Sequence, residues 1–319
     1  MYLDYYGLTE LPFEITPNPR FLLLTPMQRE ALSNLQYGIA SRKGLTLLLG
    51  DAGTGKTTLI RAAVKALGDD GAHFVTLTNP MLSRTEFAEI LASGFGLSDE
   101  ARRSKAAMLT ELETALVARR AAGRRTALVV DEAHCLPDEL LEEIRLLSNI
   151  ETDSEKLLPI ILAGQPELSK RLNRPALRQI KQRVTLRCEL RALGLHETAA
   201  YISGRIRHAG GNSSLVFTRE AVTLIHERSR GIPRLINVIC DNALVTGFAA
   251  DRRPVARDVV SEVCRDFDLG GFDSEFSESS APSTVTRALS EFAPGAEPIA
   301  EEPVAAEAPR RRFLFFRVS

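Results

Sequence analysis

Cysteine is scarce in this chain, and its four copies lie far apart without a C-x-x-C pair. That spacing argues against a structural metal site and favours a reduced protein. No apolar run approaches the ~20 residues that span a bilayer, and the N-terminus lacks the basic and apolar regions of a signal peptide. We therefore expect a soluble, cytoplasmic protein, with a peripheral position at the inner membrane as an open alternative.

An excess of either charge is also missing. Lysine and arginine number 40 against 41 aspartates and glutamates, so the formal net charge is -1. Such a chain has no general attraction to a polyanion, and any nucleic-acid site must be local. The length of 319 residues is enough for two domains.

Short apolar runs alternate with helical patterns up to about residue 190. The runs are 45–50, 73–78, 126–131, 158–164 and 184–190. Several are apolar on both faces, as strands buried in a parallel sheet are, and the segments between them carry i, i+3, i+4 apolar spacing. Residues 1–190 are thus predicted to form an α/β domain, a parallel sheet flanked by helices.

The strand signal stops after residue 190. Four helical patterns fill residues 191–268, separated by turn signals at Gly210-Gly211 and at Gly231-Ile232-Pro233. They predict a small all-helical domain. Residues 269–319 shift to serine, glutamate, alanine and proline and end in "RRRFLFFRVS", a composition typical of disorder; the final peptide is either a frayed terminus or a docking segment.

A phosphate-binding motif follows the first predicted strand directly and opens a helix. The stretch "GDAGTGKTT" has the full Walker A pattern in its required context. Its glycines let backbone N–H groups surround phosphate oxygens at a helix N-terminus. The predicted ATP-binding residues are Gly50, Asp51, Ala52, Gly53, Thr54, Gly55, Lys56, Thr57 and Thr58, with Lys56 on the β and γ phosphates and Thr57 on Mg²⁺.

The stretch "LVVDEAHCLP" supplies the matching carboxylates. Asp131 ends a predicted strand, the position at which a nucleoside triphosphatase with a Walker A motif orders Mg²⁺. Glu132 follows it and is placed to act as the general base on water. The letters D-E-A-H also name a class of helicases, but those need a second α/β domain and none follows residue 190. For His134 and Cys135 no other residue has metal-ligand spacing, so we expect packing or hydrogen bonding from them.

These motifs together resemble AAA+ ATPases of the general secretion pathway protein A (ExeA/GspA) type. The resemblance begins at residues 5–39 and continues through "GDAGTGKTT", "VVDEAHCLP", "ILAGQPEL" and "GIPRLINVICDNAL". It implies a P-loop AAA+ fold with a helical lid. It also implies that Gln165 occupies the sensor-1 position and Arg234 the sensor-2 position, facing the γ phosphate.

AAA+ proteins usually place an arginine of one subunit in the site of its neighbour. Arg183 is the first candidate here and Arg178 the second. Eight basic residues crowd this region, which fits either a subunit edge or a phosphate-backbone patch. They are Lys170, Arg171, Arg174, Arg178, Lys181, Arg183, Arg187 and Arg191. The resemblance further suggests that Phe13, Pro19 and Phe21 wall the adenine.

The implied function is an Mg²⁺-dependent ATPase that forms homo-oligomers on binding ATP and drives a bacterial secretion or exopolysaccharide export system. Larger family members continue into a transmembrane helix and a peptidoglycan-binding domain, whereas this chain ends in its acidic tail. We therefore expect it to depend on a membrane-anchored partner protein. Two alternatives stay open: a DNA-associated ATPase of the transposition-helper or initiator type, which is less favoured, and an ATP-binding switch with negligible turnover.

Overall fold

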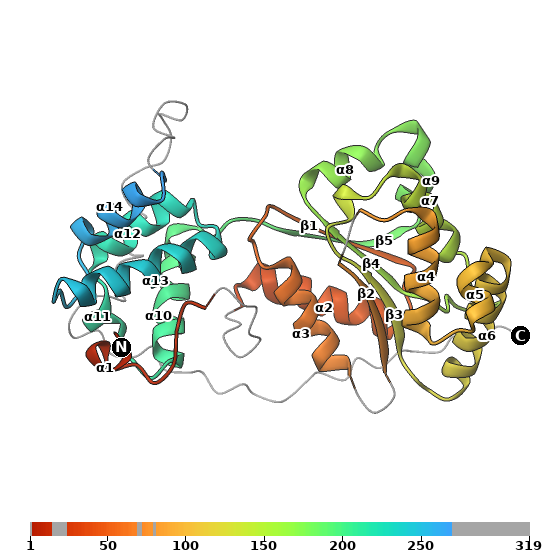
Figure 1. Cartoon of the computed structure of the whole chain (residues 1–319), viewed down its shortest axis with the longest axis horizontal. Coiled ribbons are helices and arrows are strands. Elements are labelled where there is room, and N and C mark those ends of the chain that lie inside the picture. The colour runs from red at the N-terminus through yellow and green to blue at the C-terminus, as the bar shows by residue number, and fades with distance from the viewer. Residues whose placement is uncertain (1, 15–23, 69–71, 79–80, 270–319) are drawn as a thin grey trace, which may run out of the picture.

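The computed structural model describes residues 2–14, 24–68, 72–78 and 81–269 (Figure 1). Within them the chain forms an α/β domain and a helical domain that lie side by side. All but the first residue of the predicted tail at 269–319 lies outside the described residues, as do Pro19 and Phe21. In the described part of the chain, no helix is both long and apolar enough to cross a bilayer.

A five-stranded sheet forms the centre of the α/β domain, in the order β2-β3-β4-β1-β5. The strands are β1 (Leu45–Gly50), β2 (His73–Leu77), β3 (Thr126–Val130), β4 (Ile160–Gly164) and β5 (Val184–Leu190). Every pairing is parallel, as predicted, so all five carboxyl ends lie along one edge. The strand that leads into the phosphate motif, β1, is held inside the sheet between β4 and β5.

Burial differs between the middle and the rim of this sheet. Every residue of β1, β3 and β4 is buried, which explains their continuous apolar sequences. The edge strand β5 mixes exposed and buried positions. The three strands that end beside the phosphate motif and the carboxylates are therefore the most completely buried strands of the sheet.

Helices cover both faces of the sheet (Figure 1). The helices α2 (Pro26–Ala40) and α3 (Lys56–Leu67) bury one face in a cluster around Leu48, Val129 and Ile161. The opposite face is the larger core, centred on strand residues such as Leu47 and Leu162. Its helices are α4 (Arg84–Phe95), α5 (Asp99–Arg103), α6 (Lys105–Ala121), α7 (Asp138–Leu147), α8 (Pro166–Leu172) and α9 (Arg178–Lys181), with 3-10 turns η2 (Ala133–Cys135) and η3 (Pro175–Leu177).

The helical domain has its own core, as the pattern after residue 190 predicts. Ile202, Ile225 and Ile239 are fully buried within it. Its helices are α10 (Leu195–His208), α11 (Ser213–Val216), α12 (Arg219–Ser229), α13 (Pro233–Ala249) and α14 (Arg257–Asp266).

The N-terminal segment, residues 2–13, lies against this helical domain. The sequence alone predicts that it belongs to the α/β domain. Helix α1 (Tyr2–Tyr6) buries Tyr2 and Tyr6 in the helical core. Phe13 is fully buried and packs edge-to-face on Phe217, so its ring is not an adenine wall in this structure. The buried guanidinium of Arg205 donates to the carbonyl oxygen of Pro12 and ties the segment down. Aromatic residues alone do not reveal which core they will enter.

Candidate functional site

The phosphate motif forms a tight loop between β1 and α3. Gly53 (φ +81°) and Gly55 (φ +97°) both adopt left-handed backbone, which favours glycine. A Cβ on Gly50 would stand 2.8 Å from the carbonyl oxygen of Leu190, so only glycine fits at the end of β1. The conformation of the loop therefore requires glycine at these three positions, and the loop leads directly into the N-terminus of α3.

Lys56 is the first residue of α3, and its side chain folds back across the loop. Its Nζ donates to the carbonyl oxygens of Gly50 (2.8 Å) and Asp51 (3.0 Å). Burial lowers the pKa of Lys56, while the carboxylates of Glu132 and Asp131 oppose that shift. An ammonium group has three donors, and two are held by the loop. The third is available for an anion seated in the loop.

Thr57 and Asp131 meet although 74 residues separate them. The Thr57 Oγ1 donates to Asp131 Oδ2 at 2.6 Å, which joins the start of α3 to the end of β3. Asp131 is buried, and its Oδ1 accepts from the backbone amide of Glu132 at 2.9 Å. A hydroxyl and a carboxylate oxygen beside a phosphate loop are a donor set that suits Mg²⁺. Among the described residues, no cluster of three or more His, Cys, Asp or Glu forms a separate metal site.

Glu132, His134 and Gln165 form a second group next to this pair. Glu132 adopts left-handed backbone (φ +51°), and its Oε2 lies 3.3 Å from Nδ1 of His134. On the other side of the ring, Nε2 lies 2.9 Å from Nε2 of Gln165, which follows β4. The ring of His134 thus stands between the two predicted catalytic side chains. Cys135 is exposed and not packed, but its Sγ lies 3.3 Å from Nε2 of His134, in agreement with the hydrogen-bonding alternative expected for these two residues.

Arg234 approaches the loop from the helical domain. It lies at the start of α13, and its backbone amide donates to the carbonyl oxygen of Gly53 at 3.2 Å. A Cβ on Gly53 would stand 2.8 Å from Cβ of Arg234, so the two segments are in direct contact. The side chain of Arg234 is exposed at this junction. The structure therefore brings the predicted sensor-2 residue to the phosphate loop.

Arg183 lies at the opposite end of the strands from the phosphate loop. It precedes Val184, which pairs with Leu45 at the start of β1, whereas the loop follows Gly50 at the end of that strand. Five strand residues at ~3.3 Å each place the two ends of β1 ~17 Å apart. Arg183 therefore does not join the site of its own chain. Arg178, the second candidate, is exposed at the start of α9.

Arg171 has a role that the sequence did not reveal. Its guanidinium donates to the carbonyl oxygens of His134 (2.6 Å) and Leu136 (2.8 Å) and forms an ion pair with Asp138. This one member of the basic stretch at 170–191 holds the turn after β3 from inside the domain. No spacing signal could have found it, because its partners lie more than thirty residues upstream.

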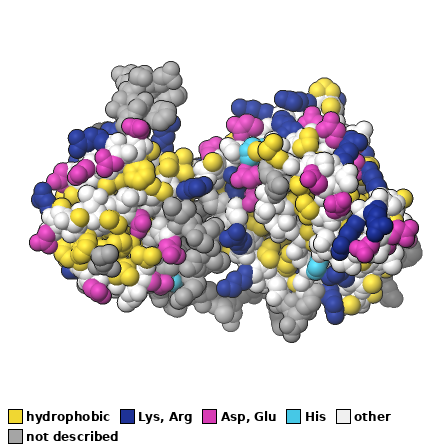
Figure 2. All heavy atoms as spheres, in the orientation of Figure 1, with side chains coloured by type: hydrophobic (Ala, Val, Ile, Leu, Met, Phe, Trp, Pro, Cys, Tyr) yellow, Lys and Arg dark blue, Asp and Glu magenta, His cyan; other side chains and the backbone are white. Residues whose placement is uncertain are grey.

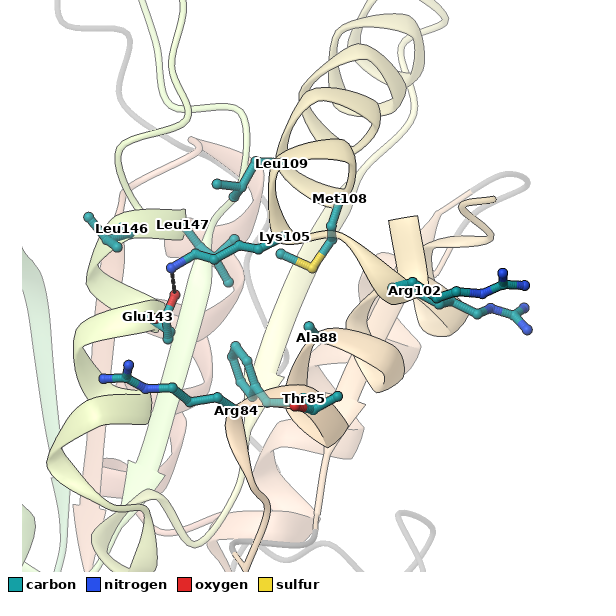
Figure 3. Close-up of a pocket in the computed structure, with 12 residues that line it drawn as sticks. Arg84, Thr85, Ala88, Arg102, Lys105, Met108, Leu109, Glu143, Leu146 and Leu147 are labelled. Carbon is teal, nitrogen blue, oxygen red and sulfur yellow. Dashed lines mark ion pairs between the residues drawn. The ribbon is translucent and has the colours of Figure 1, made fainter. Parts of the chain in front are cut away.

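A cavity of about 250 Å³ opens elsewhere, between α4, α6 and α7 (Figure 3). Its wall combines apolar residues such as Met108 and Leu147 with the ion pair between Lys105 and Glu143. None of the predicted site residues lines it. Basic and acidic side chains are interspersed over the face of the molecule seen in Figure 2, in keeping with the net charge of -1.

Residues 39–172 match the family model described as an AAA domain. The chain is 38% identical over 261 residues to General secretion pathway protein A of Aeromonas hydrophila, covering 82% of this chain and 47% of that protein. It is 29% identical over 162 residues to Mu-like prophage FluMu DNA transposition protein B of Haemophilus influenzae, covering 50% of each. This chain spans about half the length of the curated relatives it matches.

Among solved structures, the ORC2 protein of Aeropyrum pernix in its ADPNP-ADP complexes superposes with a TM-score of 0.58. The alignment covers 82% of this chain and 73% of that one at 14% identity, so it supports the fold alone. The matched AAA domain contains the phosphate loop, Asp131, Glu132 and Gln165. The parallel sheet, the family match and the similarity to a secretion protein agree with the expected AAA+ fold. The chain thus carries an AAA domain at residues 39–172 and is similar over 82% of its length to General secretion pathway protein A of Aeromonas hydrophila.

Proposed function

We propose that this protein is an Mg²⁺-dependent ATPase that drives a bacterial envelope export system, in secretion or exopolysaccharide export. The observation that carries the proposal is the 2.6 Å contact between Thr57 and Asp131. It aligns the hydroxyl of the phosphate loop with the carboxylate that such an enzyme needs for its metal, directly before the acidic residue Glu132. The export role comes from the 38% identity to General secretion pathway protein A.

The loop from Gly50 to Thr58 would bind the phosphates of ATP. Gly53 and Gly55 turn the backbone so that its N–H groups can point inward, and the N-terminus of α3 adds its positive dipole end. Lys56 contributes the ammonium donor that the loop carbonyls leave available. Asp51, Ala52 and Thr54 complete the loop.

Thr57 and Asp131 would hold Mg²⁺, which would neutralise part of the charge on the phosphates. Glu132 then acts as the general base: its carboxylate accepts a proton from water as the water oxygen bonds to the γ phosphorus. The phosphoanhydride bond breaks, leaving ADP and phosphate. Gln165 orients the water, and Arg234 neutralises charge on the γ phosphate from the helical domain.

An oligomer is needed to complete this site. Arg183 lies at the far edge of its own sheet, so it serves the nucleotide only when a neighbouring chain presents it. An arginine delivered in this way stabilises the charge that develops in the transition state. We therefore propose that ATP binding assembles homo-oligomers, and that these act on a membrane-anchored partner of the export system at the inner membrane.

The first test is phosphate release by the purified protein with ATP and Mg²⁺. We expect Lys56→Ala to lose ATP binding, and Glu132→Gln to bind ATP without turnover. His196→Asn, at an exposed position of the helical domain, is the control. Wild-type turnover by Glu132→Gln would refute the assignment of the base. Affinity capture with ATP-trapped Glu132→Gln protein then tests the export role, which recovery of transposase or replication proteins in place of envelope proteins would overturn.

A second candidate function is ATP-dependent DNA association. It is favoured by the 29% identity to a DNA transposition protein and by the exposed basic residues between Lys170 and Arg191. Anisotropy of a labelled duplex, titrated with and without ATP, separates the two functions. ATP-dependent binding with a steep salt dependence would support the DNA role, because neutralised phosphates release counterions. Equal, weak binding with either nucleotide state would exclude it.

A further inference from the structure

We propose that His134 is a positioning residue that couples the Glu132 carboxylate to Gln165 and helix α8. The proposal rests on the ATPase function proposed above and adds a residue to it. It starts from the place of the imidazole ring, between one carboxylate and one amide that come from different strands. The ring reaches both partners with different nitrogens.

The contacts around the ring indicate which of its nitrogens accepts and which can donate. Gln165 presents its amide nitrogen to Nε2 of His134 at 2.9 Å. The amide NH₂ of Gln165 only donates, and the Sγ of Cys135 lies 3.3 Å from the same Nε2, so Nε2 is placed as an acceptor and a ring with one hydrogen would carry it on Nδ1. Nδ1 is the nitrogen that faces Oε2 of Glu132 at 3.3 Å. Nδ1 therefore lies beside the Glu132 carboxylate, although no hydrogen bond joins the two in this structure.

Both facing atoms are buried, and neither has a hydrogen-bond partner within the described residues. Buried polar atoms of this kind are costly unless they pair, and each is the nearest complement of the other. Formation of the bond requires the Glu132 side chain to change its orientation. The pair is therefore set to close when the carboxylate takes its working position.

Helix α8 grips residue 134 at a second point. While Gln165 contacts the ring, Arg171 donates from Nη1 to the carbonyl oxygen of His134 at 2.6 Å. The side chain and backbone of His134 are thus contacted from the N-cap residue and from the last turn of α8. A Cβ on Gly164 would stand 3.2 Å from the His134 amide nitrogen, so β4 also packs closely here. A change in the Gln165 amide consequently reaches Glu132 through the ring.

Substitutions at position 134 can remove one contact at a time. Asparagine places its amide nitrogen near the position of Nδ1 and keeps the contact to Glu132, whereas glutamine reaches the position of Nε2 and keeps the contact to Gln165. We expect His134→Ala to lower kcat on the order of 10- to 100-fold, because a base misplaced by 1 Å has an effect of that size. His134→Asn should recover more of kcat than His134→Gln, while KM for ATP stays within about twofold in all three.

A double-mutant cycle separates coupling from a merely structural role. If the ring carries the coupling, Gln165→Ala should lower kcat much less in the His134→Ala background than in the wild-type background. His196→Asn serves as the matched control for loss of a histidine. Unchanged kcat in His134→Ala, or full additivity with Gln165→Ala, would overturn the proposal.

A readout that does not need turnover comes from ¹⁵N NMR of the imidazole ring, assigned by the loss of its signals in His134→Asn. We expect a neutral ring protonated on Nδ1, and a shift of the Nε2 resonance in Gln165→Ala. A ring protonated on Nε2 that ignores Gln165→Ala would refute the coupling. A wild-type protein that binds but does not hydrolyse ATP would refute the ATPase function instead, and the ring spectrum still decides the place of His134.

Discussion

The backbone amide of Arg234 donates to the carbonyl oxygen of Gly53, so the first turn of α13 rests on the phosphate loop. The contact joins the helical domain to the loop without using the guanidinium group. A nucleotide bound in the loop would therefore lie close to both domains. Closure of the helical domain on the α/β domain would depend on the contact between Arg234 and Gly53.

Arg234→Ala should keep the backbone contact and remove only the charge. We expect kcat to fall at least ~10-fold, with a smaller change in ATP affinity, because an arginine on the γ phosphate acts mainly in the transition state. Arg207→Ala, exposed on α10, should leave kcat unchanged. Steady-state phosphate release and fluorescent-nucleotide titration measure the two effects. Equal losses in affinity and kcat/KM with constant kcat would assign Arg234 to ground-state binding.

Loss of the metal donors should appear in the Mg²⁺ dependence. Thr57→Val and Asp131→Asn each remove one side of the 2.6 Å pair. We expect the Mg²⁺ concentration for half-maximal activity to rise at least ~10-fold in each variant. Thr110→Val, which changes an exposed threonine of α6, is the control. An unchanged Mg²⁺ requirement in both variants would place the metal elsewhere.

Subunit mixing should reveal an arginine that acts in trans. Arg183→Ala has an intact base but offers no arginine to its neighbour, and Glu132→Gln offers the arginine but lacks the base. Each alone should be nearly inactive, and a mixture should regain part of the activity at mixed interfaces. The same experiment with Arg178→Ala tests the second candidate. Wild-type turnover of Arg183→Ala alone would exclude Arg183.

Arg171→Ala should destabilise the α/β domain. The guanidinium satisfies two backbone carbonyl oxygens and pairs with Asp138, and hydrogen bonds of charged groups contribute about 1.5–3 kcal/mol each at most. We expect the free energy of unfolding to drop by about 2 kcal/mol in denaturant titrations. Arg174→Ala, exposed just after α8, should change it by less than about 0.5 kcal/mol. Similar values for both would show that Arg171 is as dispensable as a surface residue.

Alkaline pH should loosen the N-terminal helix. Burial raises the pKa of Tyr6 to about 12, above its usual value of about 10 in an unfolded chain. Because the unfolded state ionises first, the stability from this burial is intact below pH ~10 and is lost as pH rises towards 12. Tyr6→Phe should flatten the decline of the urea midpoint between pH 9 and pH 11. A slope equal to that of the wild-type protein would argue against this role of Tyr6.

Much of the fold follows from local pattern. The five predicted strands appear within two residues of their expected bounds, because apolar runs such as 45–50 and 126–131 can be satisfied only inside a sheet covered on both faces. The phosphate loop can be predicted from the sequence equally well, because its glycines and Lys56 must lie close together in the chain to surround a phosphate. In both cases the determining residues are neighbours along the chain.

Residues that are distant in sequence required the tertiary structure. His134 meets Gln165 only because β3 and β4 are adjacent in the sheet, and Arg171 reaches the same turn for the same reason. The aromatic N-terminal segment suited either domain by composition, and complementary packing with Phe217 placed it in the helical one. The sequence by itself determined the strands, the loop and the two acids, whose chemistry is local. The strand order and the packing between domains decided which side chains surround them, because those contacts depend on distances that no short stretch of chain encodes.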